Sequence, residues 1–258
     1  MILRSIVLAP APTHEYVSAW TVVEKLQRQD YSECWMITQP SHAALAGEIA
    51  AALCGPTLPR MEPDLVRAIA MHDAGWGMPD AQMIMRSQSQ GLAPRSFLQC
   101  TVGDFLAAWI QSIEIAQSTS AAGGYIVSRH FWRLAEHRLS SGHDTGRDLS
   151  RLQSFIQSEA QRQQKLASKY AGAPQELETL ADVLQFCDLL SLYLCCGARE
   201  NVEFPQYFGV RAQLTVYAEG YKLEPELVPA GTEFRVAALR HPATRQVSSQ
   251  EIVIRFVN

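Results

Sequence analysis

Apolar residues recur every three or four positions through most of residues 41–196, which is the spacing of one face of an α-helix. Proline and glycine mark the boundaries of these segments. Pro40 precedes the first segment and Gly55 closes it, while Pro63 and Pro174 suit the first turns of later helices. The pattern predicts helices at residues 41–55, 63–72, 103–119, 124–140, 147–170 and 174–196.

The two ends of the chain follow a different pattern, in which β-branched residues cluster or apolar and polar residues alternate. These runs predict strands at residues 5–8, 34–38, 213–217, 234–239 and 252–256. Between the first two, residues 15–29 are compatible with a helix or an irregular insertion. Turn residues such as Gly220 and Gly231 separate the later runs. We therefore expect a small antiparallel sheet in the C-terminal tail, to which the N-terminal strands could add.

Residues 78–100 have no helical apolar stripe and are rich in Met, Ser, Gln and Pro. They are expected to form a long loop, which in a compact domain is often functional. The whole pattern predicts a mainly α fold in three parts. Residues 1–40 hold strands and a connecting segment, residues 41–200 form a helical domain, and residues 201–258 form a β-rich extension. We expect the three to make one structural unit.

Composition and charge narrow the function classes. The 258 residues suit one sizeable domain, and the 47% of hydrophobic residues suffice for a substantial core. A formal net charge of −4 argues against a nucleic-acid-binding protein with a basic surface. No stretch is long and uncharged enough for a signal peptide or a membrane span. The six cysteines form no CxxC pair, so we expect reduced thiols in a cytoplasmic protein.

Five polar residues interrupt the apolar helical pattern: His42, His72, Asp73, His130 and Asp188. A carboxylate that is buried loses its hydration and must find a partner or stay protonated. No Lys or Arg lies within one helical turn of Asp188, and none lies within a turn of His42. A shared divalent metal would solve both problems, so the pattern points to a metal-dependent enzyme.

Each candidate also has an ordinary explanation. His42 could be a core histidine bonded to a carbonyl group. His72 and Asp73 are adjacent, so both reach one metal only if their helix ends there, which Gly75 permits. A bare His-Asp pair also occurs by chance. Asp188 could form a salt bridge with a distant arginine.

Ligand chemistry limits the choice of ion. Imidazole and carboxylate ligands without a thiolate suit Mn²⁺, Fe²⁺, Co²⁺, Ni²⁺ or Zn²⁺ rather than Ca²⁺. Two of each would leave coordination positions open for water and substrate, which is typical of a catalytic site. A metal in such a site lowers the pKa of its bound water and supplies hydroxide at neutral pH.

The order of His42, then His72-Asp73, then a distant Asp188 resembles the HD-domain superfamily of metal-dependent phosphohydrolases. The fuller pattern QPSH, HDAGW, SRHF and DLLSLYLC looks like an uncharacterised prokaryotic family, a domain of unknown function, that is often grouped with HD proteins. The resemblance covers residues 37–200. It implies an all-α bundle in which these four residues share one metal. It also implies that metal-activated water attacks a phosphate ester or nucleotide.

The same resemblance gives His130 the place of an additional histidine, which in many HD proteins binds a second metal or the phosphate. Asp73 and His130 are thus the candidate catalytic residues, and the cofactor is one divalent transition metal ion, with two as the alternative. Weaker candidates for substrate binding are Trp76, Arg95, Arg129 and Arg133, although each could equally be a core ring or a solvated charge.

The expected partner is therefore a small, phosphorylated molecule, with no nucleic acid and no membrane, and a homo-oligomer stays open. Three alternatives to a hydrolase remain. The chain could be a regulatory or ligand-binding protein that keeps the metal without turnover, an iron-dependent oxidase on the same scaffold, or a protein whose His and Asp residues form a structural network.

Overall fold

The computed structural model describes residues 1–7, 15–56, 58–243 and 249–258. Helices make up most of this part of the chain, so the predicted mainly α fold is confirmed. The α-helices are α1 (Ala19–Gln27), α2 (Gln39–Ala52), α3 (Pro63–Ala70), α4 (Gly77–Gln90), α5 (Val102–Thr119), α6 (Ala121–Ser140), α7 (Gly146–Ala167) and α8 (Pro174–Cys196). Two short 3-10 helices are η1 (Ala74–Trp76) and η2 (Phe97–Gln99).

The strands form two four-stranded sheets rather than the single tail sheet expected from the sequence. The first has the order β1-β3-β7-β8 and is antiparallel throughout, and the second has the order β2-β4-β5-β6 with a parallel β2–β4 pair. The strands are β1 (Ile2–Ser5), β2 (Tyr16–Ser18), β3 (Cys34–Ile37), β4 (Asn201–Glu203), β5 (Gln213–Val216), β6 (Tyr221–Glu224), β7 (Glu233–His241) and β8 (Ser249–Arg255). Each sheet therefore combines N-terminal with C-terminal strands.

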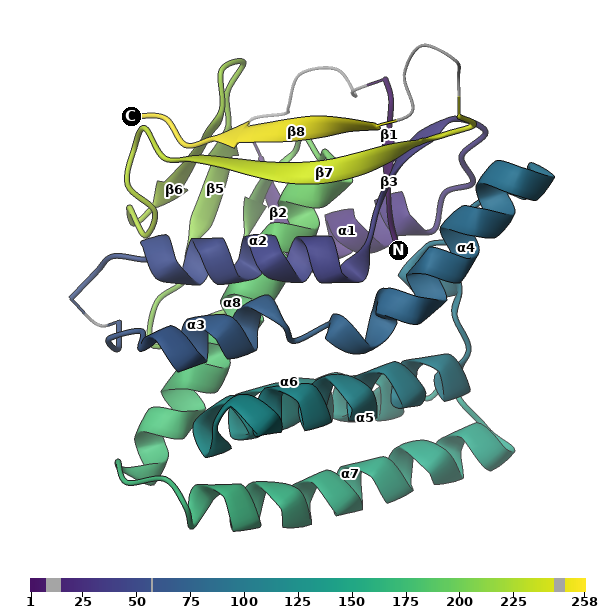
Figure 1. Ribbon diagram of the computed structural model, residues 1–258. Coiled ribbons are helices and arrows are strands. Elements are labelled where there is room, and N and C mark those ends of the chain that lie inside the picture. The colour runs from purple at the N-terminus through teal and green to yellow at the C-terminus, as the bar shows by residue number, and fades with distance from the viewer. Residues whose placement is uncertain (8–14, 57, 244–248) are drawn as a thin grey trace.

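The elements stack in layers (Figure 1). The sheets lie at one end of the molecule above α2, which packs on α3, and α5, α6 and α7 form the layers at the other end. The last helix, α8, crosses from the α7 end to the sheets and contacts α2 and α6 on the way. Side chains from α2, α6 and α8 can therefore meet in the middle of the molecule.

Helix α8 forms the centre of the core. Every residue from Val183 to Cys196 is buried. It is the one described helix whose length and composition would suit a membrane span, but 89% of its apolar window is buried inside the protein. Such burial is typical of a core helix.

The expected loop at residues 78–100 is wrong for its first half, because residues 77–90 form α4. The buried side chains of α4 are Asp80 and Ser87, both polar, so the helix has no apolar stripe that a periodicity search could find. Asp80 instead anchors α4 by accepting a hydrogen bond from the backbone N–H of Gln39 at 2.6 Å. Gly91 ends the helix with a φ of 66°, a conformation that favours glycine.

The first strand is shifted from the predicted residues 5–8 to Ile2–Ser5, where Ile2 pairs with Ile37 and Ser5 with Cys34. The reason is burial, because Ile2 is inaccessible to solvent whereas the side chain of Val7 is 79% exposed. Leu8, the end of the predicted strand, lies outside the described residues. Of the two possibilities for residues 15–29, the helix is confirmed over Ala19–Gln27 as α1, whereas Tyr16–Ser18 form the strand β2, which was not expected.

Candidate metal centre

The start of α2 places His42 in the core. Thr38 caps the helix by accepting a hydrogen bond from the backbone N–H of Ser41, and Pro40 occupies the first turn, where its missing N–H costs nothing. His42 follows one turn later and is fully buried. Gln39 lies three residues before it and therefore on the same helix face.

His72 and Asp73 lie in a turn and not in a helix. Helix α3 ends at Ala70, and η1 begins at Ala74. In a helix, neighbouring side chains point about 100° apart, but this limit does not apply to His72 and Asp73 because they lie in the turn between the two elements. Glycine is needed two positions after Asp73, because a Cβ at Gly75 would overlap the carbonyl oxygen of Ala108 in α5. This close approach fixes the turn against the bundle. The expectation that the helix ends at the His-Asp pair is confirmed.

Two further helices complete a buried cluster. His130 comes from the middle of α6 and Asp188 from the middle of α8, and their residue exposures are 1% and 8%. The structure thus brings together all five polar residues singled out in the sequence, although they are up to 146 positions apart (188 − 42). Among the described residues, the ion-pair partners of Asp188 are histidines and not the distant arginine of the structural alternative.

Four donor atoms form a ring in which imidazoles and carboxylates alternate. His42 Nε2 lies 2.8 Å from Asp73 Oδ2 and 3.9 Å from Asp188 Oδ1. His72 Nε2 lies 3.8 Å from Asp73 Oδ2 and 3.2 Å from Asp188 Oδ1. Donors about 2.1 Å from one shared ion lie roughly 3.0–3.5 Å apart. The spacing of the ring therefore fits one metal ion with small adjustments.

Hydrogen bonds on the far side of each ring determine which nitrogen faces this centre. His72 Nδ1 lies 2.8 Å from the carbonyl oxygen of Ile69, which can only accept, so Nδ1 carries the proton. The Ser191 hydroxyl donates to the carbonyl of Asp188 at 2.9 Å, which leaves its oxygen to accept from His42 Nδ1 at 3.0 Å. In both neutral imidazoles the Nε2 lone pair then points at a carboxylate.

A lone pair that faces a carboxylate is a repulsive contact unless a proton or a metal ion binds there. Burial by itself would lower the pKa of His72, but the charge of Asp73 and the hydrogen bond and charge of Asp188 outweigh it and raise this pKa to about 9. Burial would raise the pKa of Asp188, but the hydrogen bond from His72 and the charges of the three surrounding histidines lower it to about 2. The centre therefore attracts positive charge.

His130 differs from the other two histidines. Its Nδ1 accepts a hydrogen bond from the Gln185 side-chain amide at 2.9 Å, so its Nε2 carries the proton. Burial, only partly offset by the charge of Asp188, lowers the pKa of His130 to about 4 and keeps the ring neutral. Nε2 lies 3.9 Å from Asp188 Oδ2, too far for a hydrogen bond, so within the described part of the chain its N–H has no acceptor and can donate to another group.

The described residues contain two overlapping trios that could hold a metal ion. His42, His72 and Asp73 form the first, His72, His130 and Asp188 form the second, and within each trio the donor atoms lie within 4.8 Å of one another. His72 belongs to both. Buried imidazole and carboxylate donors fit a divalent transition metal.

A small pocket of about 60 Å³ opens onto this cluster. Its wall contains His42, Asp73, His130 and Asp188 together with aromatic rings. Those rings are Trp20, Trp76, Phe97, Phe105, Trp109 and Phe131. Trp76 therefore lies where the sequence reasoning placed it, beside the candidate metal ligands.

The three arginines predicted for substrate binding lie elsewhere. None of them lines the pocket at the cluster. Arg129 and Arg133 form ion pairs with Glu178, and Arg133 also pairs with Asp182, on the outer side of α6 and α8. Arg95 is exposed in the segment that follows α4. Their flanking positions along the chain were therefore a poor guide to their positions around the pocket.

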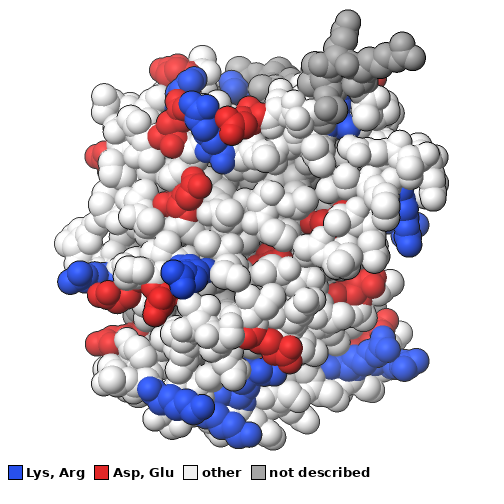
Figure 2. All heavy atoms as spheres, in the orientation of Figure 1, with Lys and Arg blue, Asp and Glu red and all other residues white. Residues whose placement is uncertain are grey.

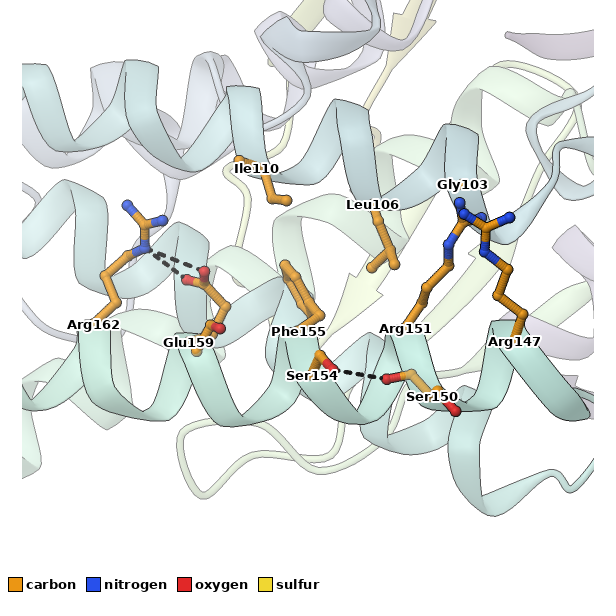
Figure 3. Close-up of a pocket in the computed structure, with 11 residues that line it drawn as sticks. Gly103, Leu106, Ile110, Arg147, Ser150, Arg151, Ser154, Phe155, Glu159 and Arg162 are labelled. Carbon is orange, nitrogen blue, oxygen red and sulfur yellow. Dashed lines mark hydrogen bonds and ion pairs between the residues drawn. The ribbon is translucent and has the colours of Figure 1, made fainter.

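A larger pocket, about 620 Å³, lies between α5 and α7 (Figure 3). Arg147, Arg151 and Arg162 point from α7 toward α5, and Phe155 lies between them. The pocket contains none of the five clustered residues. On the molecular face of Figure 2, basic and acidic residues are interspersed, with several Lys and Arg near the end formed by α7.

Sequence reasoning missed the residues that orient the imidazoles. Gln185, which bonds His130, and Ser191, which bonds His42, each lie three positions from Asp188 on α8. This spacing is the signal that could have found them, because residues three apart share a helix face.

The fold and the cluster together define a helical protein with a buried candidate metal centre. A family model described as "Protein of unknown function (DUF3891)" matches residues 26–234, and the chain belongs to this family. The match includes every residue of the cluster. No curated protein and no solved structure matches the chain.

Proposed function

We propose that this protein is a metal-dependent enzyme of the HD type, in which His42, His72, Asp73 and Asp188 hold a divalent transition metal. One observation carries the proposal. Two imidazole lone pairs, fixed by Ser191 and by the carbonyl group of Ile69, face two buried carboxylates across distances of 2.8–3.9 Å. A proton can relieve this contact at His72, whose pKa is raised to about 9, whereas one shared metal ion would relieve it at both imidazoles.

The first candidate reaction is hydrolysis. A bound divalent metal would lower the pKa of a coordinated water and polarise a substrate oxygen. Around it, the chain supplies a neutral His130, whose free Nε2–H can donate a hydrogen bond to the oxygen that becomes negative during the reaction. Gln185 keeps that proton on Nε2. The aromatic rings in the wall of the pocket limit the access of bulk water. Because water screens charges, its exclusion strengthens the electrostatic interactions inside the pocket.

A phosphate ester or nucleotide is the substrate class that the HD resemblance suggests. The wall of the pocket favours a second candidate, iron-dependent oxidation of a small organic molecule. Among the described residues that line the pocket, none is Lys or Arg, whereas six are aromatic. A dianionic phosphate usually binds to such cations, and a small apolar molecule does not need them.

Elemental analysis of protein purified without chelator tests the proposal. The wild type should contain about one transition metal ion per chain, and Asp188→Ala and His72→Ala should lose it. Asp182→Ala is the matched control, because Asp182 lies on the same helix but pairs with Arg133 outside the pocket. This variant should keep the metal. Wild-type protein that is metal-free and takes up none of the five candidate ions would contradict the proposal.

The identity of the metal then selects the assay. Iron leads to measurement of oxygen uptake with a panel of small organic molecules, and the other ions lead to a panel of phosphate esters. Bound metal without turnover in either panel would favour the regulatory alternative, in which the site binds a ligand and does not transform it.

A further inference from the structure

The large pocket between α5 and α7 has an apolar wall that solvent reaches. Leu106 and Ile110 line it from α5 and Phe155 lines it from α7, and Ile110 is 39% exposed. The volume of about 620 Å³ lies within the range of small-molecule pockets, which is about 300–1,000 Å³. Such pockets combine apolar side chains with a few polar or charged groups that orient the ligand. The wall could therefore cover the apolar part of a bound molecule.

The charges in this pocket are unevenly compensated. Arg147, Arg151 and Arg162 point from α7 toward α5 (Figure 3). Among the described residues that line the pocket, the only carboxylate is that of Glu159. It pairs with Arg162 at 3.0 Å, so these two charges neutralise each other. Arg147 and Arg151 remain for another partner.

Arg147 and Arg151 lie together at the end of the pocket that Gly103 lines (Figure 3). They are one helical turn apart, a spacing at which like charges repel each other. Within the described part of the chain, Arg147 has no ion-pair partner, and Arg151 reaches Asp148 only at 3.7 Å. A Cβ at Gly103 would lie 3.2 Å from Arg151 Nη1, so glycine leaves room for this guanidinium group. An anion at this end would relieve the repulsion.

The cations and the apolar wall follow one another along the pocket. Phe155 comes one turn after Arg151 on α7, and Glu159 comes one turn later. The eight residues from Arg151 to Glu159 span about 12 Å of helix. A ligand in this pocket would thus have a charged end and an apolar body of roughly this length.

We propose that the large pocket binds a small amphipathic anion that is free in solution. Its head is a single oxyanion, such as a carboxylate, that binds to Arg147 and Arg151. Guanidinium groups suit this role because their N–H donors match the geometry of an oxyanion. The apolar body of the ligand lies along Leu106, Ile110 and Phe155. The pocket shares no described lining residue with the metal pocket, so the binding requires no metal.

Three probes test the two parts of the ligand: octanoate, 1-octanol and acetate. Calorimetry with chelator-treated protein prevents the carboxylate from binding to a metal in the small pocket. Octanoate should bind once per chain. 1-Octanol, which has the chain but no charge, should bind about three- to tenfold more weakly, the range expected for ion pairs that are partly exposed. Acetate should bind at least about 50-fold more weakly, which corresponds to the burial of about three CH₂ groups.

Variants of the charged end locate the head. Arg151→Gln should weaken the binding of octanoate about three- to tenfold and leave that of 1-octanol unchanged, because it removes one ion pair and no apolar contact. Lys165→Gln is the matched control. Lys165 is an exposed cation on the same helix, but it lines the neighbouring small pocket and not the large one. This variant should bind both probes as the wild type does.

A second pair of variants locates the apolar body. Ile110→Gln should weaken the binding of octanoate and of 1-octanol alike, by about fivefold, because it makes the apolar wall polar. Val253→Gln is the control, since Val253 is also 39% exposed but lies on β8 in the sheet at the other end of the molecule. It should leave the binding of both probes unchanged.

Several results would overturn the inference. Wild-type protein that does not bind octanoate, or binds it no better than 1-octanol, has no site for an amphipathic anion. Equal losses in Arg151→Gln and Lys165→Gln would place the head outside the large pocket. Binding to vesicles of anionic phospholipid without binding of octanoate would indicate a membrane surface and not a pocket for a free molecule. All these measurements use metal-free protein, so they leave the proposed metal site untouched.

Discussion

Two pockets of this protein each contain a buried carboxylate, and the two carboxylates differ in what surrounds them. Glu159, in the large pocket between α5 and α7, is 1% exposed and pairs with Arg162 at 3.0 Å. It also accepts a hydrogen bond from Ser128 at 2.8 Å. Asp188, in the small pocket, has only histidines as ion-pair partners among the described residues. A permanently charged arginine thus neutralises the first carboxylate, whereas the second depends on groups that can lose their proton.

This difference indicates why the smaller pocket is the better candidate for chemistry. The pocket at Glu159 has about 620 Å³, tenfold more than the 60 Å³ at Asp188, yet the buried charge in its wall is already compensated. The small one holds imidazole lone pairs that are aimed at carboxylates. Such a contact is costly unless a proton or a metal ion binds there, and a cluster of this kind is typical of a functional site.

The largest expected effect comes from exchanging each carboxylic acid for its amide. Asp188→Asn should weaken metal binding by at least about 100-fold, because it removes a ligand, whereas second-shell changes alone cost 10- to 100-fold. Its amide N–H can donate to the His72 lone pair, so the metal-free variant should be as stable as the wild type. Metal affinity is measured by calorimetry and stability by urea unfolding.

Glu159→Gln should have the opposite profile, with unchanged metal affinity. It should lower the free energy of unfolding by about 1–3 kcal/mol, because it leaves the charge of Arg162 without its partner; this is less than for a fully buried pair, since the Arg162 side chain is 28% exposed. If both variants lost metal, or neither did, the contrast between the two carboxylates would have no functional meaning.

The next effect is the pH dependence of stability in metal-free protein. The pKa of His72 is raised from 6.5 to about 9, so its proton stabilises the fold below pH 6.5, and this contribution is lost as the pH rises toward 9. The pKa of His130 is lowered from 6.5 to about 4, so stability also falls as the pH decreases from 6.5 toward 4. Metal-free stability should therefore be highest near pH 6.5.

Urea unfolding at pH 6.5 and 8.5 checks the alkaline side of this profile. With chelator present, the free energy of unfolding should fall by on the order of 1–3 kcal/mol between the two values. With one equivalent of zinc the fall should disappear, because the metal replaces the proton on His72. His143→Ala, which changes an exposed histidine, should behave as the wild type. A metal-free profile that is flat above pH 6.5 would contradict the arrangement of charges around His72.

The sequence predicted helices well where their buried side chains are apolar, and poorly where the buried side chains are polar. Periodicity and proline located α8 at its observed bounds, because nearly all of its buried residues are apolar. It missed α4, whose buried residues are Asp80 and Ser87. The strand at the N-terminus was misplaced because short apolar runs do not determine register, which depends on the partner β3.

The same distinction applies to the site. His42, His72, Asp73, His130 and Asp188 could be found from the cost of burying them, which is a property of each residue in its own segment. Which nitrogen of each imidazole faces the centre could not be found in this way. That depends on partners from other segments, such as Ser191 for His42, at a separation of 149 positions in the chain. Arg129 and Arg133 likewise have partners, Glu178 and Asp182, that local sequence does not reveal.

The smallest expected effect concerns one of these partners. Ser191→Ala removes the oxygen that accepts the Nδ1 proton of His42, so His42 can rotate or place its proton on Nε2, where it would oppose the metal. Metal affinity should fall about tenfold, the lower end for a residue that acts through a ligand. Ser128→Ala is the matched control, since its buried hydroxyl also bonds a polar side chain of the core, here by donating to Glu159 in the other pocket. It should leave metal affinity unchanged. Equal metal affinity in the wild type and Ser191→Ala would mean that the hydrogen bond from His42 to Ser191 does not determine which nitrogen of His42 faces Asp73. The two pockets would then differ only in the partners of their carboxylates.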